Sequence, residues 1–493
     1  MARRGTGVEV LPEYLLDAET PTCPHGPMML FERLNTKDPT TVETFYACSA
    51  NRERNDCPFY LKKGDKISAA KTEAWKQIIA DSQPKYSHAE LYSRLVKLQE
   101  NPGNKRQCCL TCGELLIGEA CDHKDHRLSH QLSDQDLRSP TKFLTPLSGN
   151  STNAQYLFSD KSVDFTVSLL EDLKVTKVLC VGAPRIHEEL CQSFPHIGSF
   201  LLDLDPRLQQ FHSLEALCRY NMFNHHFFDG KTAQDNYKSF LSKDISRIMI
   251  VMDPPFGGLI DSLAFNLRRI LKDIRSSLQV EQDVYVLWFF PYFMEQRIIE
   301  KFPDFTMLDY KVDYDNHADF KSRDSGGSKH GSPVRIFTNV PPERVVLPES
   351  EGYKFCAKCK RFVSRENQHC PECDACTSKD GRTYFHCFKC KRCVKPSKQH
   401  CDSCNLCQLP GHKCGQPVAQ GCFICGDLQH KKSRCPKRKR LSNESESVCV
   451  GNLLECLINM PLILGATIRE TWDYGNFLCK IASWSSGIQA SPS

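Results

Sequence analysis

The middle of the chain alternates short apolar runs with longer amphipathic segments. The apolar runs are Lys177–Gly182, Ser199–Asp205, His225–Gly230, Arg247–Phe256 and Asp283–Pro291. Near-continuous runs of Val, Ile, Leu and Phe at this length are typical of strands that are buried on both faces of a parallel sheet. Because amphipathic segments of helical length separate the runs, the pattern predicts a doubly wound α/β domain.

Two further runs, Thr306–Tyr314 and Val334–Val340, end this region. A Gly/Ser/Lys-rich segment without a helical pattern separates them, so they are predicted to form an antiparallel hairpin at the end of the sheet. Seven strands with a terminal hairpin resemble the class I methyltransferase fold, which is α/β and Rossmann-like. The resemblance covers residues 150–345, and a linker, Pro341–Gly352, follows.

The composition changes this picture mainly through cysteine. The chain has 493 residues, which predicts two to four domains. Hydrophobic residues make up 40% and charged residues 25%, as in ordinary globular protein, and the net charge of +5 fits nucleic-acid binding without establishing it. Many of the 28 cysteines recur as C-x2-C pairs beside histidines, which is zinc-site spacing rather than a disulfide framework.

The expected location follows from the same residues. Zinc thiolates persist where thiols stay reduced, which indicates the cytosol or nucleus. Met1-Ala-Arg-Arg is followed by no apolar signal core. The most apolar late stretch, Val448–Ala466, is interrupted by polar residues and by Pro461, so no membrane span is predicted.

The fourth apolar run closes with Asp253-Pro254-Pro255-Phe256. In open α/β sheets, ligands bind beyond the carboxyl ends of the strands, so this turn occupies a catalytic position. The Asp253 carboxylate and the Pro254 carbonyl can each accept a hydrogen bond from an amino group and favour charge that develops on its nitrogen. The prolines stiffen the turn, and Phe256 can stack on an extruded base. The alternative is a proline turn that only ends a buried strand.

This turn resembles the Asp/Asn/Ser-Pro-Pro-aromatic signature of amino-methyltransferases, in which those acting on adenosine in RNA often carry aspartate first. The resemblance implies S-adenosylmethionine as the methyl donor and the adenosine N6 amine as the acceptor. It is less specific for RNA over DNA or over a glutamine side chain, so a protein amide methyltransferase remains an alternative.

The same resemblance implies where the cofactor binds. The family has a glycine-bearing turn after strand one, an acidic residue for the ribose hydroxyls after strand two and an adenine contact after strand three. An aromatic segment upstream covers cofactor and substrate. Each matching residue could instead be an ordinary strand-end carboxylate or core aromatic. In that order, the matching residues are Gly182 and Arg185; Asp203 and Asp205; Asp229; and Gln155, Tyr156, Leu157 and Phe158.

The first cysteine cluster lies within residues 20–65. Its candidate ligands are Cys23, His25, Cys48 and Cys57, a set that suits tetrahedral zinc. The surrounding residues resemble a GRF-type zinc finger, a binder of single-stranded nucleic acid, although the Gly-Arg dipeptide of that finger is absent. A purely structural zinc clip is the alternative. The groups suited to phosphate contact and base stacking are Arg52, Arg54, Lys62, Lys63, Phe59 and Tyr60.

A second cluster lies within residues 105–135 and resembles a C2H2 finger with one extra residue in its loop. The predicted ligands are Cys109, Cys112, His126 and His130. On a helix, the two histidines would be one turn apart and face one metal. Cys121 and His123 are competing ligands.

Residues 353–416 contain an internal repeat of the pattern C-x2-C-x9-H-C-x2-C-x2-C with a period of 31 residues. It resembles the cysteine-rich domain of DHHC palmitoyltransferases, in which ligands from successive segments interleave, although the Asp-His-His-Cys tetrad is missing. Zinc is expected to hold so cysteine-rich a segment together. Interleaving implies four zinc sets: Cys356, Cys359, His369 and Cys376; Cys370, Cys373, His386 and Cys393; Cys387, Cys390, His400 and Cys407; and Cys401, Cys404, His412 and Cys414.

Residues 420–437 match the CCHC zinc knuckle through Cys422, Cys425, His430 and Cys435. Knuckles bind single-stranded RNA by stacking and base-edge contacts, and a basic run that follows would contact phosphates or direct nuclear targeting. A protein-binding knuckle is the alternative. Residues 441–493 carry no motif that predicts a structure.

The order of these modules resembles the zinc-knuckle (CCHC) adenosine-N6 methyltransferases of large-subunit ribosomal RNA, over residues 23–435. The resemblance implies a ribosomal RNA stem-loop as substrate and a role in translation. It also implies work in the nucleolus and nucleus with presence in the cytoplasm. Ribosome-biogenesis or RNA-processing proteins are candidate partners. An inactive RNA-binding scaffold remains an alternative, because the turn at Gly182 is poor in glycine. The sequence leaves the oligomeric state open.

Overall fold

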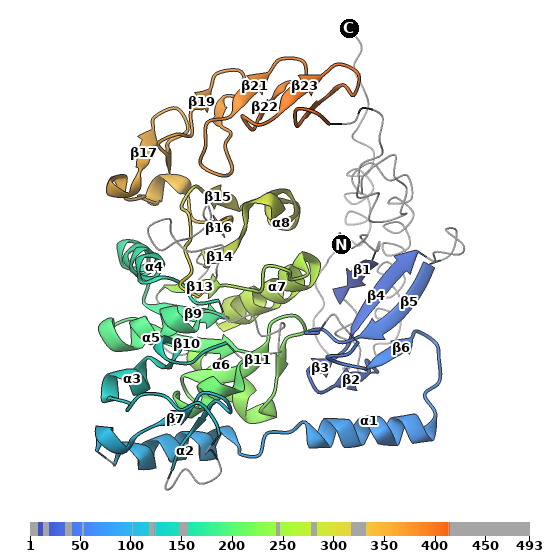
Figure 1. Ribbon diagram of the computed structural model, residues 1–493, viewed down its shortest axis with the longest axis vertical. Coiled ribbons are helices and arrows are strands. Elements are labelled where there is room, and N and C mark those ends of the chain that lie inside the picture. The colour runs from blue at the N-terminus through green and yellow to red at the C-terminus, as the bar shows by residue number, and fades with distance from the viewer. Residues whose placement is uncertain are drawn as a thin grey trace, which may run out of the picture. The chain divides into compact units, whose positions relative to one another are not determined.

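The centre of the computed structural model is an eight-stranded, mostly parallel sheet with helices on both faces (Figure 1). The predicted α/β class is therefore confirmed. The structure describes residues 8–12, 19–34, 42–51, 54–100, 102–117, 123, 125–146, 156–242, 247–277, 283–316, 332–412 and 414.

The sheet has the order β12-β11-β10-β9-β13-β14-β16-β15. Strands β9, β10, β11, β13 and β14 are parallel, and β16 is antiparallel to both of its neighbours, β14 and β15. Without the short edge strand β12, the order is 3-2-1-4-5-7-6, with the predicted terminal hairpin formed by β15 and β16. The strands are β9 (Lys177–Val181), β10 (Gly198–Asp203), β11 (Leu217–Asn221), β12 (His226–Phe227), β13 (Ile248–Met252), β14 (Tyr285–Pro291), β15 (Thr306–Leu308) and β16 (Val334–Thr338).

The prediction of the third strand at His225–Gly230 is wrong. The parallel neighbour of β10 is β11, Leu217–Asn221, and only His226–Phe227 extends the sheet beyond it, as an antiparallel edge. Arg219 interrupts the apolar run of β11, so the sequence pattern does not indicate a strand there. Its guanidinium lies over the Phe228 ring at 4.1 Å, so the charge is accommodated at the sheet edge.

Successive residues of the central strands enter two different hydrophobic cores. Val178 and Cys180 of β9 pack on the face covered by α4 and α5, whereas Leu179 and Val181 pack on the face covered by α6, α7 and α8. Strand side chains alternate between faces, and burial of both faces explains why the runs are apolar throughout. The helices are α4 (Asp160–Asp172), α5 (Pro184–Ser193), α6 (Gly230–Ser242), α7 (Ile260–Ser277) and α8 (Glu295–Lys301).

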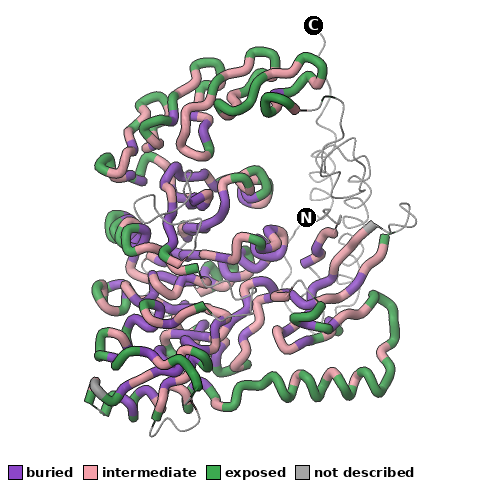
Figure 2. Tube along the Cα trace, in the orientation of Figure 1, coloured by how far each residue is buried: buried purple, intermediate pink, exposed green. Residues whose placement is uncertain are grey.

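The segment before this domain forms two small modules joined by helices. The first module combines a four-stranded sheet, β1-β4-β5-β6, with the hairpin β2-β3, and the second contains the hairpin β7-β8. Figure 2 shows α1 mostly exposed, with a few half-buried positions, and none of its residues is buried. The elements are β1 (Val8–Leu11), β2 (Thr22–Cys23), β3 (Gly26–Pro27), β4 (Met29–Leu34), β5 (Val42–Ala47), β6 (Tyr60–Lys62), α1 (Ala69–Asp81), α2 (His88–Gln99), β7 (Cys108–Cys109), β8 (Glu114–Leu115) and α3 (Asp134–Arg138).

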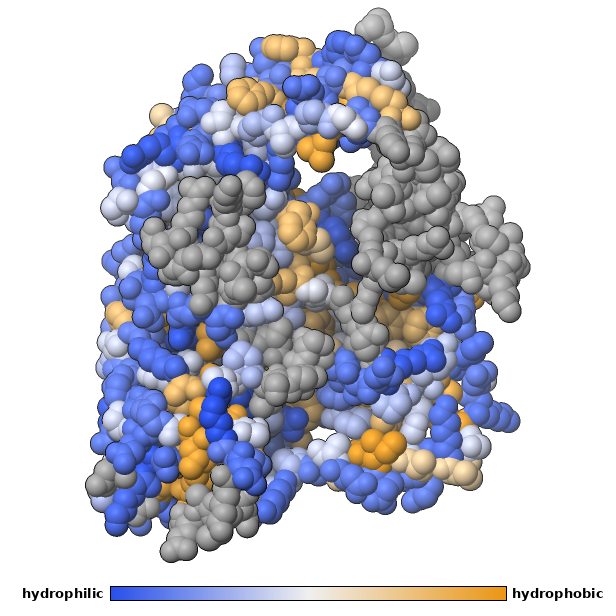
Figure 3. Space-filling view, in the orientation of Figure 1, coloured by the Kyte–Doolittle hydropathy of each residue, from blue (hydrophilic) through white to orange (hydrophobic). Residues whose placement is uncertain are grey.

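After the sheet, the chain forms four successive two-stranded hairpins. Each hairpin turns through one residue with positive φ, at Lys360, Asp374, Lys391 and Asn405. The repeated sequence therefore produces a repeated turn. Figure 3 shows hydrophobic side chains among hydrophilic ones on the surface of this array, where Phe385 and Phe388 are exposed. The hairpins are β17 (Tyr353–Cys356) with β18 (Arg361–Ser364), β19 (His369–Cys370) with β20 (Ala375–Cys376), β21 (Phe385–Cys387) with β22 (Arg392–Val394), and β23 (Gln399–Cys401) with β24 (Leu406–Gln408).

Several predictions concern residues that the structure does not describe. These are the CCHC knuckle with Cys422, Cys425, His430 and Cys435, the tail 441–493, Gln155, Cys121 and Arg52. Within the described ranges, no helix is long and apolar enough to cross a membrane.

Candidate active site

The Asp253–Phe256 turn leaves the sheet at the carboxyl end of β13. The Asp253 N–H donates to the Val181 carbonyl at 3.0 Å, which continues the β9–β13 ladder into the turn, and the Gly258 N–H donates to the Pro255 carbonyl at 2.6 Å. The Tyr314 hydroxyl donates to Oδ1 of Asp253 at 2.8 Å. Backbone and side chain of the aspartate are therefore both held in place.

The Asp253 carboxyl lies in an environment that disfavours its charge. Burial raises its pKa well above the usual range, and the Asp203 carboxylate adds to this, while the hydrogen bond from Tyr314 acts in the opposite direction. A positive charge that develops beside Asp253 would therefore gain more stabilisation than it would in water.

Three aromatic rings surround the turn. The Phe256 ring is nearly parallel to that of Tyr156, with 5.9 Å between centroids and 9° between planes. The Tyr314 ring meets Phe256 edge-on at 5.5 Å. Tyr156 is 36% exposed, whereas Tyr314 is fully buried. The Tyr156–Phe256 pair thus combines an exposed ring with one beside the aspartate, as a site for a planar base requires.

The Tyr156–Phe158 segment is held against the chain around Tyr314. The Asp315 N–H donates to the Leu157 carbonyl at 2.9 Å, and the Leu157 N–H donates to Oδ1 of Asn316 at 2.8 Å. Arg185 donates to the Phe158 carbonyl and to the Asp315 carboxylate. Arg185 was predicted to bind cofactor; the structure instead places it where it ties these two segments together.

A cavity lies at the carboxyl ends of β9, β10, β11 and β13. Phe158, Arg185 and Asp229, all in the described part of the chain, lie outside its lining. Its lining includes these predicted site residues: Tyr156, Leu157, Gly182, Asp203, Asp205, Asp253, Pro254, Pro255 and Phe256. The lining residues that sequence reasoning missed include Arg207, Asn221, Met222, Phe223 and Asn316.

Gly182 lies where β9 ends and the cavity begins. Its φ is +67°, and a Cβ there would lie 2.7 Å from Cε of Met222 and 3.0 Å from the Asp253 carbonyl oxygen. Only glycine fits both the left-handed backbone and this close approach. A single glycine is therefore sufficient for the turn, and the low glycine content of this segment no longer supports an inactive scaffold.

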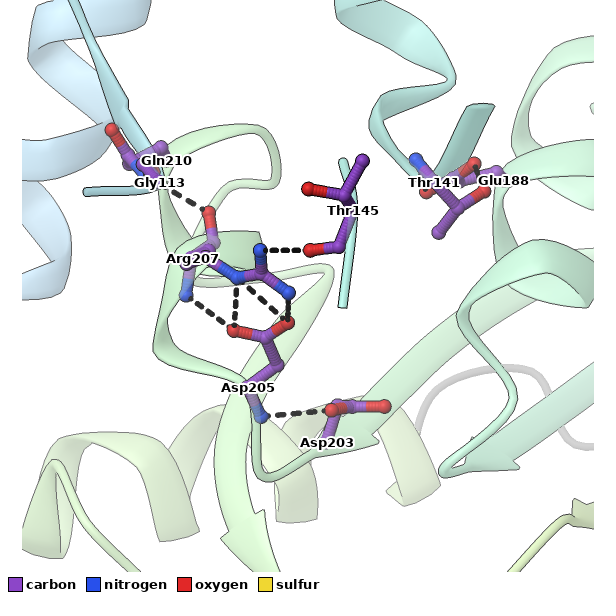
Figure 4. A network of polar contacts seen from close by, with 8 residues as sticks. All are labelled: Gly113, Thr141, Thr145, Glu188, Asp203, Asp205, Arg207 and Gln210. Atoms are coloured by element: carbon purple, nitrogen blue, oxygen red, sulfur yellow. Dashed lines mark hydrogen bonds and ion pairs between the residues drawn. The ribbon is translucent and has the colours of Figure 1, made fainter. Parts of the chain in front are cut away.

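The two acidic residues at the end of β10 and just beyond it differ in their environments, as Figure 4 shows. The Asp205 carboxylate accepts from the Arg207 guanidinium, with Nε–Oδ1 at 3.0 Å and a further contact to Oδ2 at 2.8 Å. The Asp203 carboxylate lines the cavity and accepts at Oδ1 from the Asp205 N–H at 2.9 Å. Burial raises the pKa of Asp203 to about 7. Asp203 is thus the better candidate to meet a ligand, and Asp205 has a structural partner.

The placement of Asp229 corrects the prediction for this residue. Its carboxylate accepts from Nε2 of Gln209 at 2.8 Å, and it follows the edge strand β12 rather than the third strand. The true third strand, β11, ends at Asn221, which does line the cavity. If Leu217–Asn221 had been recognised as a strand, Asn221 would have been predicted at the cavity, because ligand-binding residues follow the carboxyl ends of parallel strands.

The first cysteine cluster has the predicted members. The ligand atoms of Cys23, His25, Cys48 and Cys57 lie within 4.8 Å of one another, and the three cysteines are buried. Nε2 of His25 lies 3.1 Å from the Asn51 side-chain amide, which orients the ring with Nδ1 toward the thiols.

The stacking groups predicted for this module need a correction at Phe59. This side chain is 1% exposed and packs on Trp75 at 4.7 Å in the module's own core, so it cannot meet a base. Tyr60 is covered by the Arg54 guanidinium at 3.9 Å, and Lys62 pairs with Glu43 at 3.1 Å.

The second cluster differs from the prediction in one residue, since His123 takes the place of His130. Cys109, Cys112, His123 and His126 converge within 4.8 Å, whereas Nε2 of His130 lies 3.4 Å from the Asp136 carboxylate. The prediction of His130 assumed a helix after His126. The chain there is extended, since Leu128 bridges Cys109, and a spacing of four residues on extended backbone spans about 13 Å.

The array brings together the interleaved sets that the resemblance implied. Three sets converge within 4.8 Å: Cys356, Cys359, His369 and Cys376; Cys370, Cys373, His386 and Cys393; and Cys387, Cys390, His400 and Cys407. In the fourth implied set, Sγ of Cys401 and Sγ of Cys414 lie 3.5 Å apart, and Nε2 of His412 lies 3.4 Å from Sγ of both Cys404 and Cys414.

The strand order, the Asp253–Phe256 turn and the cavity beside it define a class I methyltransferase of the amino-nitrogen type. A family described as "Probable N6-adenine methyltransferase" matches residues 149–329. The rRNA N(6)-adenosine-methyltransferase ZCCHC4 of Homo sapiens is 47% identical over 444 residues, 88% of this chain and 86% of the relative. The protein of that name from Mus musculus is 45% identical (95% and 93% covered), and that from Xenopus tropicalis 42% (91% and 94%). The chain belongs to the family of these rRNA N(6)-adenosine-methyltransferases.

Proposed function

We propose that this chain transfers the methyl group of S-adenosylmethionine to N6 of an adenosine in ribosomal RNA. The observation that carries the proposal is the Asp253 carboxylate, fixed by Tyr314 at the edge of the cavity and adjoined by the parallel rings of Phe256 and Tyr156. Relatives with 42–47% identity that carry the name rRNA N(6)-adenosine-methyltransferase support the choice of acceptor.

The residues along the cavity fit the proposed cofactor. S-adenosylmethionine supplies an electrophilic methyl group when it is bound. The Asp203 carboxylate is placed to accept hydrogen bonds from ribose hydroxyls, and the missing Cβ of Gly182 leaves room for close approach. Phe223 lines the same cavity beyond β11 and suits contact with a purine ring. The Asn221 side chain lines it too, but its amide donates to the His25 carbonyl and the Ser49 hydroxyl and accepts from the Phe223 N–H.

The acceptor amine is activated by placement and charge. One oxygen of Asp253 is occupied by the Tyr314 hydroxyl, so the other carboxylate oxygen and the Pro254 carbonyl are the acceptors for the two N6 hydrogens. These hydrogen bonds orient the nitrogen lone pair and stabilise the positive charge that develops there. Phe256 and Tyr156 hold the base plane. The transfer requires no general base before the bond to carbon forms.

The cysteine and histidine clusters fit zinc. Sets of thiolate and imidazole ligands within 4.8 Å match tetrahedral zinc coordination better than they match any oxygen-preferring cation. Zinc would hold each hairpin of the array, which has few buried apolar side chains, and would fold the first module around its small core.

The proposal also covers the natural substrate, the location and the partners of the enzyme. The substrate is a stem-loop of large-subunit ribosomal RNA, which the zinc modules and the CCHC knuckle contact. The enzyme works in the nucleolus and nucleus, is also present in the cytoplasm, and affects translation through the modified ribosome. Partners among ribosome-biogenesis or RNA-processing proteins follow from that location.

The test is methyl transfer to ribosomal RNA by the purified chain, with mapping of the modified base. Asp253→Ala removes both carboxylate oxygens, so transfer should fall by about a hundredfold to a thousandfold while affinity for cofactor and RNA is retained. Asp261→Ala is the matched control, because Asp261 pairs with Arg297 and Lys301 away from the cavity.

The rival functions give different outcomes in the same assay. Cofactor binding without transfer to any adenosine-containing RNA would support the inactive scaffold. Transfer to a protein glutamine amide but not to RNA would support the amide methyltransferase.

A further inference from the structure

The loop that follows β10 forms one wall of the cavity and also contacts the Cys109 module. Gln210 makes the connection: its Nε2 donates to the Gly113 carbonyl at 2.7 Å, and its Oε1 accepts from the Leu115 N–H at 2.8 Å. Gln210 is 3% exposed. The module is therefore joined to this loop through its own main chain, at the hairpin that carries two of the clustered cysteines.

Arg207 runs from the module to the acidic residues of the cavity and is 6% exposed (Figure 4). At one end, its aliphatic stem lies so close to Gly113 that a Cβ there would overlap Cδ of Arg207. At the other end, the guanidinium contacts both carboxylate oxygens of Asp205 through Nε and donates to the Thr145 carbonyl at 2.8 Å. The planar fork thus fixes Asp205 in one orientation.

Asp205 passes this orientation to the residue that faces the cavity. Its N–H donates to Oδ1 of Asp203 at 2.9 Å (Figure 4). A continuous series of contacts therefore leads from Gly113 in the module through Arg207 and Asp205 to the Asp203 carboxylate. Every step is a packed or hydrogen-bonded contact between buried or half-buried groups.

We propose that Arg207 is a positioning residue of the cofactor site, through which the Cys109 module sets the orientation of Asp203. The inference rests on the proposed function, in which Asp203 accepts hydrogen bonds from the cofactor ribose. It adds a role for a zinc module other than contact with RNA. Cofactor affinity depends on the packing of this module even when no RNA is present.

The experiment is calorimetric titration of the full chain with S-adenosylhomocysteine, a probe that allows no turnover. Arg207→Lys keeps the charge and loses the fork, so the Kd for the probe should rise at least tenfold. Affinity for a ribosomal RNA stem-loop and zinc content should stay within twofold of wild type. The matched control is Arg335→Lys, because Arg335 is equally buried but donates to Ser332 and Val334 in the other half of the sheet.

A second variant changes the Cys109 module and leaves Arg207 itself unaltered. Gly113→Ala leaves every clustered cysteine and histidine in place but crowds Arg207, and Gly113 has a φ of +75°. It should also raise the Kd for the probe, and the double variant should show less than the product of the two single effects.

The outcomes separate this inference from the proposed function. If wild type has no affinity for the probe, the proposed function fails. If wild type and Arg335→Lys bind the probe and a folded, zinc-loaded Arg207→Lys binds it equally well, the positioning role of Arg207 is wrong. Should Arg207→Lys not fold, unchanged probe affinity in Gly113→Ala overturns the inference instead.

Discussion

At the scale of single residues, the proposed reaction centre contains the Asp253 carboxylate, whose charge is disfavoured by burial. Asp253 could be identified from sequence because Asp-Pro-Pro-Phe is a contiguous pattern at the end of an apolar run. Tyr314, which donates to it, lies 61 residues further along the chain. No local pattern connects the two, so only the packing of the Tyr314 loop against β13 shows the pair.

Tyr314→Phe should lower kcat by about tenfold to a hundredfold, because a hydrogen bond to a charged group contributes about 1.5–3 kcal/mol. The phenylalanine ring would retain its contacts with Phe158 and Phe256. Loss of the donor raises the pKa of Asp253 further, so the acidic limb of the kcat profile should move to higher pH, with KM for the cofactor unchanged.

Tyr310→Phe is the matched control for this measurement. Tyr310 is equally buried and stacks on Phe165, but its hydroxyl points to the Lys161 carbonyl at 3.4 Å. Equal kcat values for Tyr314→Phe and wild type would show that the hydrogen bond to Asp253 has no part in catalysis.

At the scale of elements, long apolar runs predicted β9, β13 and β14 well, since burial on both faces leaves a continuous signal. The prediction failed at β11, where a charged residue in an edge-side strand broke the run. Histidines buried between α2, α5 and η5 (Pro206–Gln210) were not singled out at all. The rings of His187 and His212 lie 4.9 Å apart, and Nε2 of His88 lies 2.9 Å from the His212 carbonyl.

These buried histidines should make the fold sensitive to acid. Burial lowers the pKa of His212 to about 4 and that of His187 well below its usual value. Between about pH 6.5 and pH 4, the unfolded chain binds protons that the folded chain does not. The contribution of these histidines to the free energy of unfolding should therefore be constant above about pH 6.5 and fall below it, by about 1.4 kcal/mol per pH unit for each such histidine.

Denaturant unfolding at pH 7.5, 6.5, 6 and 5.5 measures this slope. His212→Asn should lower the slope of the free energy of unfolding against pH relative to wild type, whereas His196→Asn should not, because His196 is exposed and pairs with Glu171. A slope in His212→Asn that equals that of wild type would rule out the buried cluster as its source.

At the scale of the whole molecule, cysteine spacing predicted which segments gather side chains suited to metal, but not every member of each cluster. The described residues contain six clusters of suitable side chains, and the CCHC pattern adds another site outside them. The interleaved pairs of the array follow from a strict repeat. The second cluster has no such repeat, and its members depend on the path of the chain after His126.

The purified chain should contain about seven zinc ions, and stepwise removal with a chelator should lower its thermal stability in more than one step. Cys112→Ser should remove one ion, and His123→Ala should do the same, whereas His130→Ala should leave the zinc content unchanged. Loss of an ion in His130→Ala but not in His123→Ala would restore the helical C2H2 arrangement.

The sequence by itself determined the α/β class, the Asp-Pro-Pro-Phe turn at the end of a strand and the cysteine-rich character of both flanks. These features depend on contiguous runs or short fixed spacings, which the covalent chain preserves. Only the tertiary structure decided that Tyr314 holds Asp253, that Asn221 replaces Asp229 at the cavity, that His123 replaces His130, and that Asp205 is bound by Arg207. Those assignments depend on contacts between residues far apart in the chain or on the local path of the backbone, which spacing does not specify.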